Sequence, residues 1–244
     1  MQGLSTAPIV LASASPRRRE LLAALGIAFT VIATDAEECV DTPPDAVLAG
    51  LPPLDLVVSD HPTLRAWRKA SAVLVPGAVV LGVDTTVVID GMVLNKPQDD
   101  ADGRRMLAHL SGRTHLVHSG ICVLSVADGS ASAEAIGLGT QWMWLSLVTS
   151  EVEFYDLTSD QIAAYVASGE PHDKAGAYGI QGRGGQLVRA VRGSYTNVVG
   201  LPLGETAHLL AAAGVAILRD PAECYRQWVK SQGKEPLPCP PTQP

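Results

Sequence analysis

The sequence predicts an α/β fold with a mixed sheet, and three observations support this prediction. Segments typical of strands and of helices alternate along most of the 244 residues. Asp90-Gly91 separates two apolar runs and is a strong signal for a tight hairpin. Two long strand candidates, 115–126 and 141–154, follow one another with a loop rich in glycine, serine and alanine between them. Because hairpins pair antiparallel strands, a mixed sheet is favoured over a purely parallel, doubly wound one.

The first predicted strand and helix carry the most informative motif. Residues 9–12 are apolar and are typical of a short buried strand. Ser15 suits the N-cap of the following helix, Pro16 its first position, and Gly26 its end. Arginines at 17–19 lie at the helix N-terminus, whose partial positive charge disfavours cations. Backbone N–H groups and arginine side chains gathered at one point predict an anion site, with phosphate the expected ligand. A solvated basic turn is the alternative.

The remaining elements follow in chain order. A helix between 159 and 169 is expected to be capped by Ser159 and ended by Gly169. The proline-rich stretch at about 41–62 is expected to be an irregular insertion. We expect a single domain over 1–232 and a disordered tail at 233–244. Further strands are expected at 29–33, 78–89, 92–94 and 187–191, and further helices at 63–74, 99–110, 205–213 and 221–230.

Composition narrows the function classes. Hydrophobic residues make up 47% of the chain, which is enough for a large core, and the formal net charge of -7 disfavours a nucleic-acid-binding surface. The four cysteines show neither CxxC pairs nor zinc spacing, and no apolar run has the length of a membrane span. We therefore expect a cytoplasmic protein with reduced thiols and neither a nucleic-acid nor a membrane partner.

Asp84 interrupts the apolar run 79–89. A carboxylate in a buried strand is costly unless it is paired, hydrogen-bonded or bound to a metal, so Asp84 is a candidate functional residue. A structural hydrogen bond to a nearby turn is the alternative. Glu37 and Glu38 follow an earlier strand and offer a second carboxylate, although Glu38 by itself also fits a solvated loop charge. Two carboxylates and a polyphosphate are the usual ligands of Mg²⁺.

Three further residues are candidates for substrate binding. Lys96 follows a strand and precedes Pro97, and Lys69 lies on a predicted helix. Either lysine is able to neutralise phosphate, and either also fits an ordinary surface position. Gln181 stands in a glycine-rich segment, where its amide is able to contact a base or a ribose. The glycines around it fit a tight turn equally well.

Five segments in order resemble the Maf family, the septum-formation-inhibitor-like nucleotide pyrophosphatases. Together they cover most of the chain between residues 9 and 210. They are LASASPRR at 11–18, GVDTTVV at 82–88, Lys96-Pro97 with LSGRTH at 110–115, GEPHDKAGAYGIQG at 169–182, and VVGLPL at 198–203.

The resemblance implies an enzyme that hydrolyses nucleoside triphosphates to the monophosphate and pyrophosphate with a divalent metal, Mg²⁺ or Mn²⁺. It implies an elongated mixed α/β fold like that of the inosine triphosphate pyrophosphatases, with a cleft between two lobes, in a homodimer. It also implies roles for single residues. The proton acceptor falls on Asp84, metal ligands on Asp84 and Glu38, and phosphate-binding positions on Ser13, Arg17, Lys69 and Lys96. Arg18, Thr85 and Gln181 match the residues that mark the dTTP/UTP pyrophosphatase branch.

The chain departs from the family pattern in two places. The stretch between Glu38 and Lys69 is longer than usual, and the loop after Val126 is extended. A different class of function also stays open, namely a nucleotide-binding regulator of cell division that does not hydrolyse its ligand.

Overall fold

The computed structural model describes residues 7–39, 41–73, 75–125 and 132–233, so the predicted tail lies outside the described residues except for Gly233. The strands are β1 Ile9–Ala12, β2 Thr30–Ile32, β3 Val79–Ile89, β4 Met92–Leu94, β5 Thr114–Ser125, β6 Ile136–Leu138, β7 Gln141–Phe154 and β8 Val188–Arg192. The α-helices are α1 Pro16–Ala24, α2 Asp45–Gly50, α3 Pro62–Ala72, α4 Asp100–Leu110, α5 Ser159–Val166, α6 Tyr195–Val199, α7 Leu203–Ala212 and α8 Pro221–Ser231. Short 3₁₀ turns are η1 Ala36–Glu38, η2 Val58–Asp60, η3 Glu170–Asp173, η4 Ala175–Ala177 and η5 Arg183–Leu187.

The sheet is mixed, as the sequence predicts. Its strand order is β2-β1-β3-β5-β7-β6, with β4 paired to β3 and β8 paired to β7. Strand β1 runs parallel to both β2 and β3. The pairs β3–β4, β6–β7 and β7–β8 are antiparallel. No helix among the described residues is both long enough and apolar enough to cross a membrane.

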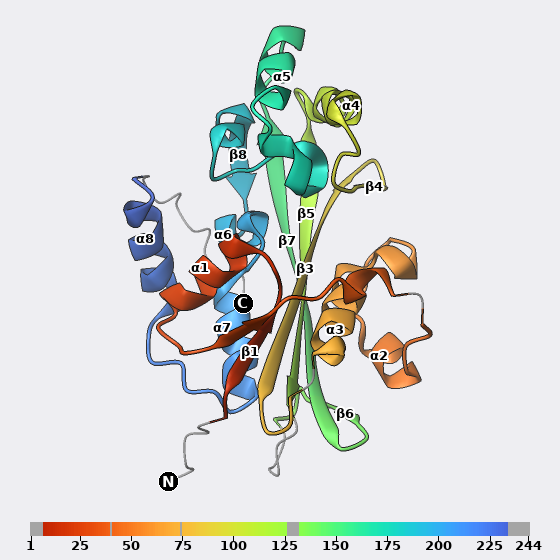
Figure 1. Cartoon of the computed structure of the whole chain (residues 1–244), viewed down its shortest axis with the longest axis vertical. Coiled ribbons are helices and arrows are strands. Elements are labelled where there is room, and N and C mark those ends of the chain that lie inside the picture. The colour runs from red at the N-terminus through yellow and green to blue at the C-terminus, as the bar shows by residue number, and fades with distance from the viewer. Residues whose placement is uncertain (1–6, 40, 74, 126–131, 234–244) are drawn as a thin grey trace. The chain divides into compact units, whose positions relative to one another are not determined.

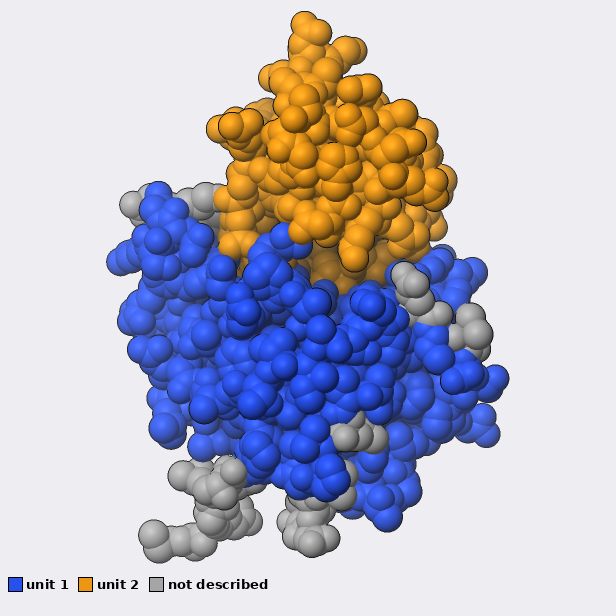
Figure 2. Space-filling view, viewed as in Figure 1, with its two compact units in different colours: residues 1–84, 119–148, 200–237 blue, residues 85–118, 149–199, 238–244 orange. Residues whose placement is uncertain are grey.

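The chain divides into two compact units (Figure 2). The first unit comprises residues 1–84, 119–148 and 200–237, and the second comprises 85–118, 149–199 and 238–244. The division falls between Asp84 and Thr85 inside β3. The single domain over 1–232 and the cleft between two lobes stay predictions.

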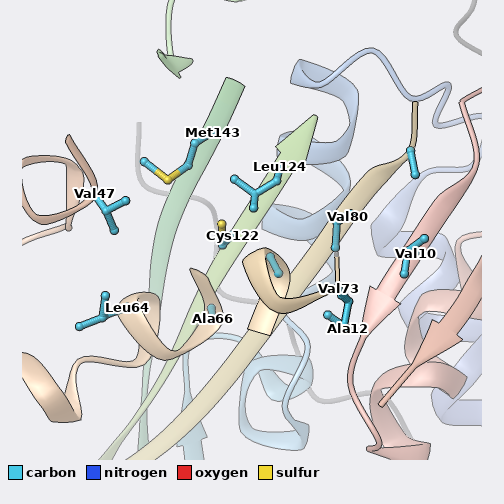
Figure 3. Packing of buried hydrophobic residues seen from close by; sticks show 12 residues of the cluster. Val10, Ala12, Val47, Leu64, Ala66, Val73, Val80, Cys122, Leu124 and Met143 are labelled. Atoms are coloured by element: carbon cyan, nitrogen blue, oxygen red, sulfur yellow. The ribbon is translucent and has the colours of Figure 1, made fainter. Parts of the chain in front are cut away.

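The core of the first unit lies between α3 and one face of its strands. Figure 3 shows side chains of α3 packed with residues of β1, β3, β5 and β7. Val10 and Ala12 alternate with Ile9 and Leu11 along β1, and all four are buried. Because successive strand residues point to opposite faces, both faces of β1 are covered. Figure 1 shows α1, α7 and α8 on the other side of these strands from α2 and α3.

Local signals at α1 are confirmed. Ser15 accepts a hydrogen bond from the backbone N–H of Arg18, and Pro16 occupies the first turn. Gly26 follows the helix with a φ of 74°, a left-handed conformation that glycine adopts without steric cost.

Three local predictions are wrong. The stretch 41–62 is not wholly irregular, because it contains α2 and η2, and α2 forms because Val47 becomes fully buried in the core. The loop between the two long strands contains β6, which gains its pairing from β7. Helix α5 is capped by Thr158 in a capping box with Gln161, not by Ser159. Helix α6 lies between the predicted elements.

The second unit contains the predicted hairpin and an aromatic cluster. Asp90 and Gly91 both have positive φ, 52° and 72°, as a two-residue hairpin turn between β3 and β4 requires. His115 lies edge-on to the rings of Phe154 and Tyr178, and its Nε2 is 2.9 Å from the Tyr178 hydroxyl. Burial lowers the pKa of His115 to about 4, so the imidazole is neutral at pH 7.

Candidate active site

Three parallel strands of the first unit bring the candidate residues to one edge of the sheet. The register pairs Ala12 of β1 with Ile32 of β2 and with Gly82 of β3. Strands β1 and β2 therefore end level with Gly82, two residues before Asp84 in β3. Ser13, which follows β1, and η1, which follows β2, thus begin close to Asp84. Carboxyl ends of neighbouring parallel strands are a common position for ligand sites in α/β sheets.

A buried lysine joins two carboxylates at this edge. Lys69 Nζ of α3 donates a hydrogen bond to Asp84 Oδ1 over 2.7 Å, and lies 3.2 Å from Glu37 Oε1 of η1. The side chains of Lys69 and Asp84 are only 6% and 11% exposed. Charges removed from water need close partners, and this arrangement supplies one cation for two anions. Lys69 is therefore not an ordinary surface lysine, and the functional roles of Asp84 and Lys69 stay predictions.

Two glycines let α3 lie close to the sheet. A Cβ on Gly82 would lie 2.1 Å from the Ala66 carbonyl oxygen. A Cβ on Gly120 of β5 would lie 2.1 Å from the Thr63 backbone nitrogen. Both distances are far below van der Waals contact, so only glycine fits at either position. Lys69 lies about one helical turn after Ala66 on α3. Because α3 packs so close to the sheet, the Lys69 side chain reaches Asp84.

Glu37 has oxygen atoms in two different environments. Its Oε1 faces Lys69, whereas its Oε2 is buried without a hydrogen-bond partner in the structure. An unsatisfied buried carboxylate oxygen is costly, so a hydrogen-bond donor or a cation would fit at this point. The carboxylates of Asp84 and Glu37 are hard oxygen donors of the kind that Mg²⁺ and Mn²⁺ prefer. Among the described residues no group of three or more metal-ligating side chains occurs, so phosphate or water oxygens would complete the shell.

Arg18 is held at the same edge by the turn after β1. Its Nη1 donates to Ser13 Oγ over 3.3 Å, and its Nε donates to the Gly200 carbonyl oxygen over 2.9 Å. Burial lowers the pKa of the guanidinium, while the charges of Asp84 and Glu37 act to raise it. Arginine stays charged at neutral pH, so Arg18 adds a second cation beside the two carboxylates.

The other predicted residues divide between the two units. Arg17 is half-buried at the start of α1 in the first unit. Thr85, Lys96 and Gln181 belong to the second unit, where Lys96 is exposed and the other two are half-buried. Glu38 is the last residue of η1, and its side chain lies outside what the structure describes.

Sequence reasoning missed two contributions to the site. It named Glu37 only together with Glu38 as a possible second carboxylate and did not foresee its contact with Lys69. The metal-binding role that the family resemblance gives to Glu38 stays a prediction. It also gave Gly200 no role, although the VVGLPL motif at 198–203 was a signal for it.

This mixed α/β protein, with a buried acid–lysine pair and arginines beside the carboxyl ends of parallel strands, has the features of an enzyme class that acts on phosphate esters or anhydrides. A family model described as "Maf-like protein" matches residues 8–213, and the chain belongs to the Maf family.

Curated relatives extend over most of the chain. A "dTTP/UTP pyrophosphatase" from Anaeromyxobacter dehalogenans (strain 2CP-C) is 50% identical over 206 residues, which cover 84% of this chain and 94% of the relative. Proteins of the same name from Moorella thermoacetica and Methylobacillus flagellatus are each 46% identical. These matches cover 86% of this chain and 96% and 94% of the respective relatives.

Proposed function

We propose that this protein is a nucleoside triphosphate pyrophosphatase that hydrolyses dTTP and UTP, and modified pyrimidine nucleotides, to the monophosphate and pyrophosphate. The observation that carries the proposal is the buried contact between Lys69 Nζ and Asp84 Oδ1, which lies near the carboxyl ends of β1 and β2 and in the middle of β3. The names of the relatives support the substrate class.

Asp84 acts as the proton acceptor in this proposal. A water oxygen attacks the α-phosphorus, one of its protons passes to the Asp84 carboxylate, and the bond between the α-phosphorus and the α–β bridging oxygen breaks. Pyrophosphate leaves with the electron pair of that bond. Lys69 holds Asp84 in place through its short hydrogen bond and supplies positive charge as negative charge develops on the phosphate oxygens.

A divalent cation, Mg²⁺ or Mn²⁺, would be held by Asp84 and Glu37 and would supply charge neutralisation and polarisation of the phosphate oxygens. The buried, unpartnered Glu37 Oε2 supports this assignment. Glu38, which the family resemblance favours, stays a second candidate ligand from the same turn.

The remaining residues are assigned to substrate binding. Ser13 and Arg17 would contact phosphate at the start of α1, where N–H groups favour an anion. Lys96 would neutralise the leaving pyrophosphate. Arg18, Thr85 and Gln181 would select the pyrimidine base. The family resemblance also supports a homodimer in the cytoplasm.

The test is a pyrophosphate-release assay over a panel of dTTP, UTP, dCTP, dATP, GTP and ITP with Mg²⁺ or Mn²⁺. Release is expected to be fastest with dTTP and UTP, and Asp84→Asn is expected to lower kcat by about 10²–10⁴-fold. Asp45→Asn, an exposed acid in the same unit, is the matched control and is expected to keep wild-type turnover.

Three results would contradict the proposal. Wild-type turnover by a folded Asp84→Asn variant would exclude Asp84 as the proton acceptor. Fastest turnover of ITP would assign the protein to purine nucleotides instead. Tight binding of dTTP without pyrophosphate release would favour the nucleotide-binding regulator.

A further inference from the structure

Loop 179–184 of the second unit carries Gln181 and is attached to a single carboxylate. Glu170 Oε1 accepts hydrogen bonds from the Tyr165 hydroxyl over 3.0 Å and from the Gly184 N–H over 3.1 Å. Glu170 Oε2 accepts one from the Arg183 N–H over 3.0 Å. Hydrogen bonds to an ionised acceptor are about twice as strong as those between neutral groups. Glu170 thus holds the C-terminal half of the loop directly after Gln181.

Tyr165 connects the same carboxylate to the other end of the loop. Its hydroxyl oxygen accepts a hydrogen bond from the Gly179 N–H over 3.0 Å while its proton is donated to Glu170. The side chain is 5% exposed, and burial raises the pKa of the phenol above its usual value. The hydroxyl therefore keeps its proton at neutral pH and bridges both ends of the loop.

Three glycines of the loop pack directly on this pair. A Cβ on Gly184 would lie 2.6 Å from the Tyr165 hydroxyl oxygen, and one on Gly182 would lie 2.6 Å from either Glu170 carboxylate oxygen. A Cβ on Gly179 would lie 2.5 Å from Lys174 Cε and 3.1 Å from Glu170 Oε1. The backbone on each side of Gln181 is therefore in contact with Glu170 or Tyr165.

The pair itself stands on fixed structure. Tyr165 lies on α5, whose N-terminus has a capping box and whose Ile162 and Val166 are buried. The Glu170 carbonyl oxygen accepts a hydrogen bond from Lys174 Nζ over 2.7 Å. Because Tyr165 and the Glu170 backbone are themselves fixed, the Glu170 carboxylate is able to hold loop 179–184 in one conformation.

We infer that Glu170, with Tyr165, is a positioning residue that sets the place of Gln181 and thereby the preference for the pyrimidine base. The inference rests on the proposed function. Neither residue is assigned a contact with substrate. Because base contacts of this kind contribute to binding in the ground state as much as in the transition state, losing the position of Gln181 raises KM and leaves kcat nearly unchanged.

The test compares Glu170→Gln and Tyr165→Phe with the wild type, with Asp160→Asn on α5 as an exposed control. Glutamine offers one acceptor oxygen where glutamate offers two, so at least one N–H of the loop loses its partner. The KM for dTTP is expected to rise roughly tenfold in each variant, with kcat within about twofold of wild type. Discrimination between dTTP and dCTP, whose rings are alike in size but differ in donors and acceptors, is expected to fall by a similar factor.

A double substitution separates positioning from general support of the fold. If Glu170 acts through Gln181, adding Glu170→Gln to Gln181→Ala changes kcat/KM for dTTP by less than about twofold. The inference would be overturned if Glu170→Gln lowered kcat/KM for dTTP by the same factor in the wild type and in Gln181→Ala. It would also be overturned if folded Glu170→Gln and Tyr165→Phe kept the wild-type KM. Either result would leave the proposed function intact. If the wild type released no pyrophosphate from dTTP, both would fall.

Discussion

Gly82 of β3 faces Ala66 of α3 so closely that a Cβ at position 82 would lie 2.1 Å from the Ala66 carbonyl oxygen. The obstacle is helix backbone, which is unable to move aside as the end of a flexible side chain would. Asp84 lies two residues further along β3, and Lys69 lies one turn from Ala66 on α3. Because Gly82 has no side chain, α3 is able to pack close enough to β3 for Lys69 to reach Asp84.

Gly82→Ala is expected to displace α3 and lower the free energy of unfolding by about 1–3 kcal/mol, the range for overpacking a close-packed core. Because the displacement lengthens the contact between Lys69 and Asp84, turnover of dTTP is expected to fall by more than the loss of folded protein explains. Urea unfolding and pyrophosphate release check both effects. Gly204→Ala is the control, since nothing lies within 4 Å of a Cβ there. Equal stability of the two variants would contradict the prediction.

Lys69→Met removes the cation that two carboxylates share. Asp84 and Glu37 then lose the cation that contacts both, although Arg18 still lies near them, so the free energy of unfolding at pH 7 is expected to fall by about 3 kcal/mol. Adding Glu37→Gln to Lys69→Met is expected to restore part of this loss. Lys230→Met on α8, where the lysine is exposed, is the control for the loss of one lysine charge. Unfolding curves that do not differ between Lys69→Met and Lys230→Met would exclude a stabilising role for the cluster.

His115 predicts a loss of stability in mild acid. Burial depresses its folded-state pKa to about 4, below the unfolded value of 6.5, so the unfolded chain binds the proton more readily. The contribution of the neutral imidazole is complete above pH 6.5 and is lost as the pH falls from 6.5 toward 4, by about 3 kcal/mol in all. Unfolding measured across this window checks the slope, and His115→Gln is expected to flatten it. The same slope in both proteins would assign it to other groups.

His172 predicts a dependence of opposite sign. The hydrogen bond from its Nε2 to Asp100, over 2.8 Å, raises the pKa of this exposed imidazole, with support from the Gly169 carbonyl oxygen. A raised folded-state pKa contributes stability that is complete below pH 6.5 and is lost as the pH rises through the folded value. Exchange of the backbone N–H groups of η3 is expected to be slower at pH 6 than at pH 8 after correction for intrinsic rates. This difference is expected to disappear in Asp100→Asn, and its persistence there would contradict the role of the pair.

The sequence by itself determined the elements whose signals are local. Ser15, Pro16 and Gly26 define α1 because capping, a fixed φ and a positive φ each depend on one residue and its neighbours. Asp90-Gly91 defines the hairpin for the same reason. Asp84 also stood out, because its charge conflicts with the apolar run around it.

Only the tertiary structure decided the elements and contacts that depend on distant partners. Helix α2 and strand β6 have weak local signals. Helix α2 is stabilised by packing against the core, and β6 is stabilised by pairing with β7. Whether Glu37 contacts Lys69 depends on the direction in which the short turn η1 points its side chains. The hydrogen bonds from loop 179–184 to Glu170 form only because the chain reverses and brings the Arg183 and Gly184 N–H groups to the carboxylate. Burial, close packing and ion pairs each require two segments that are distant in the sequence, so a pattern within one segment does not predict them.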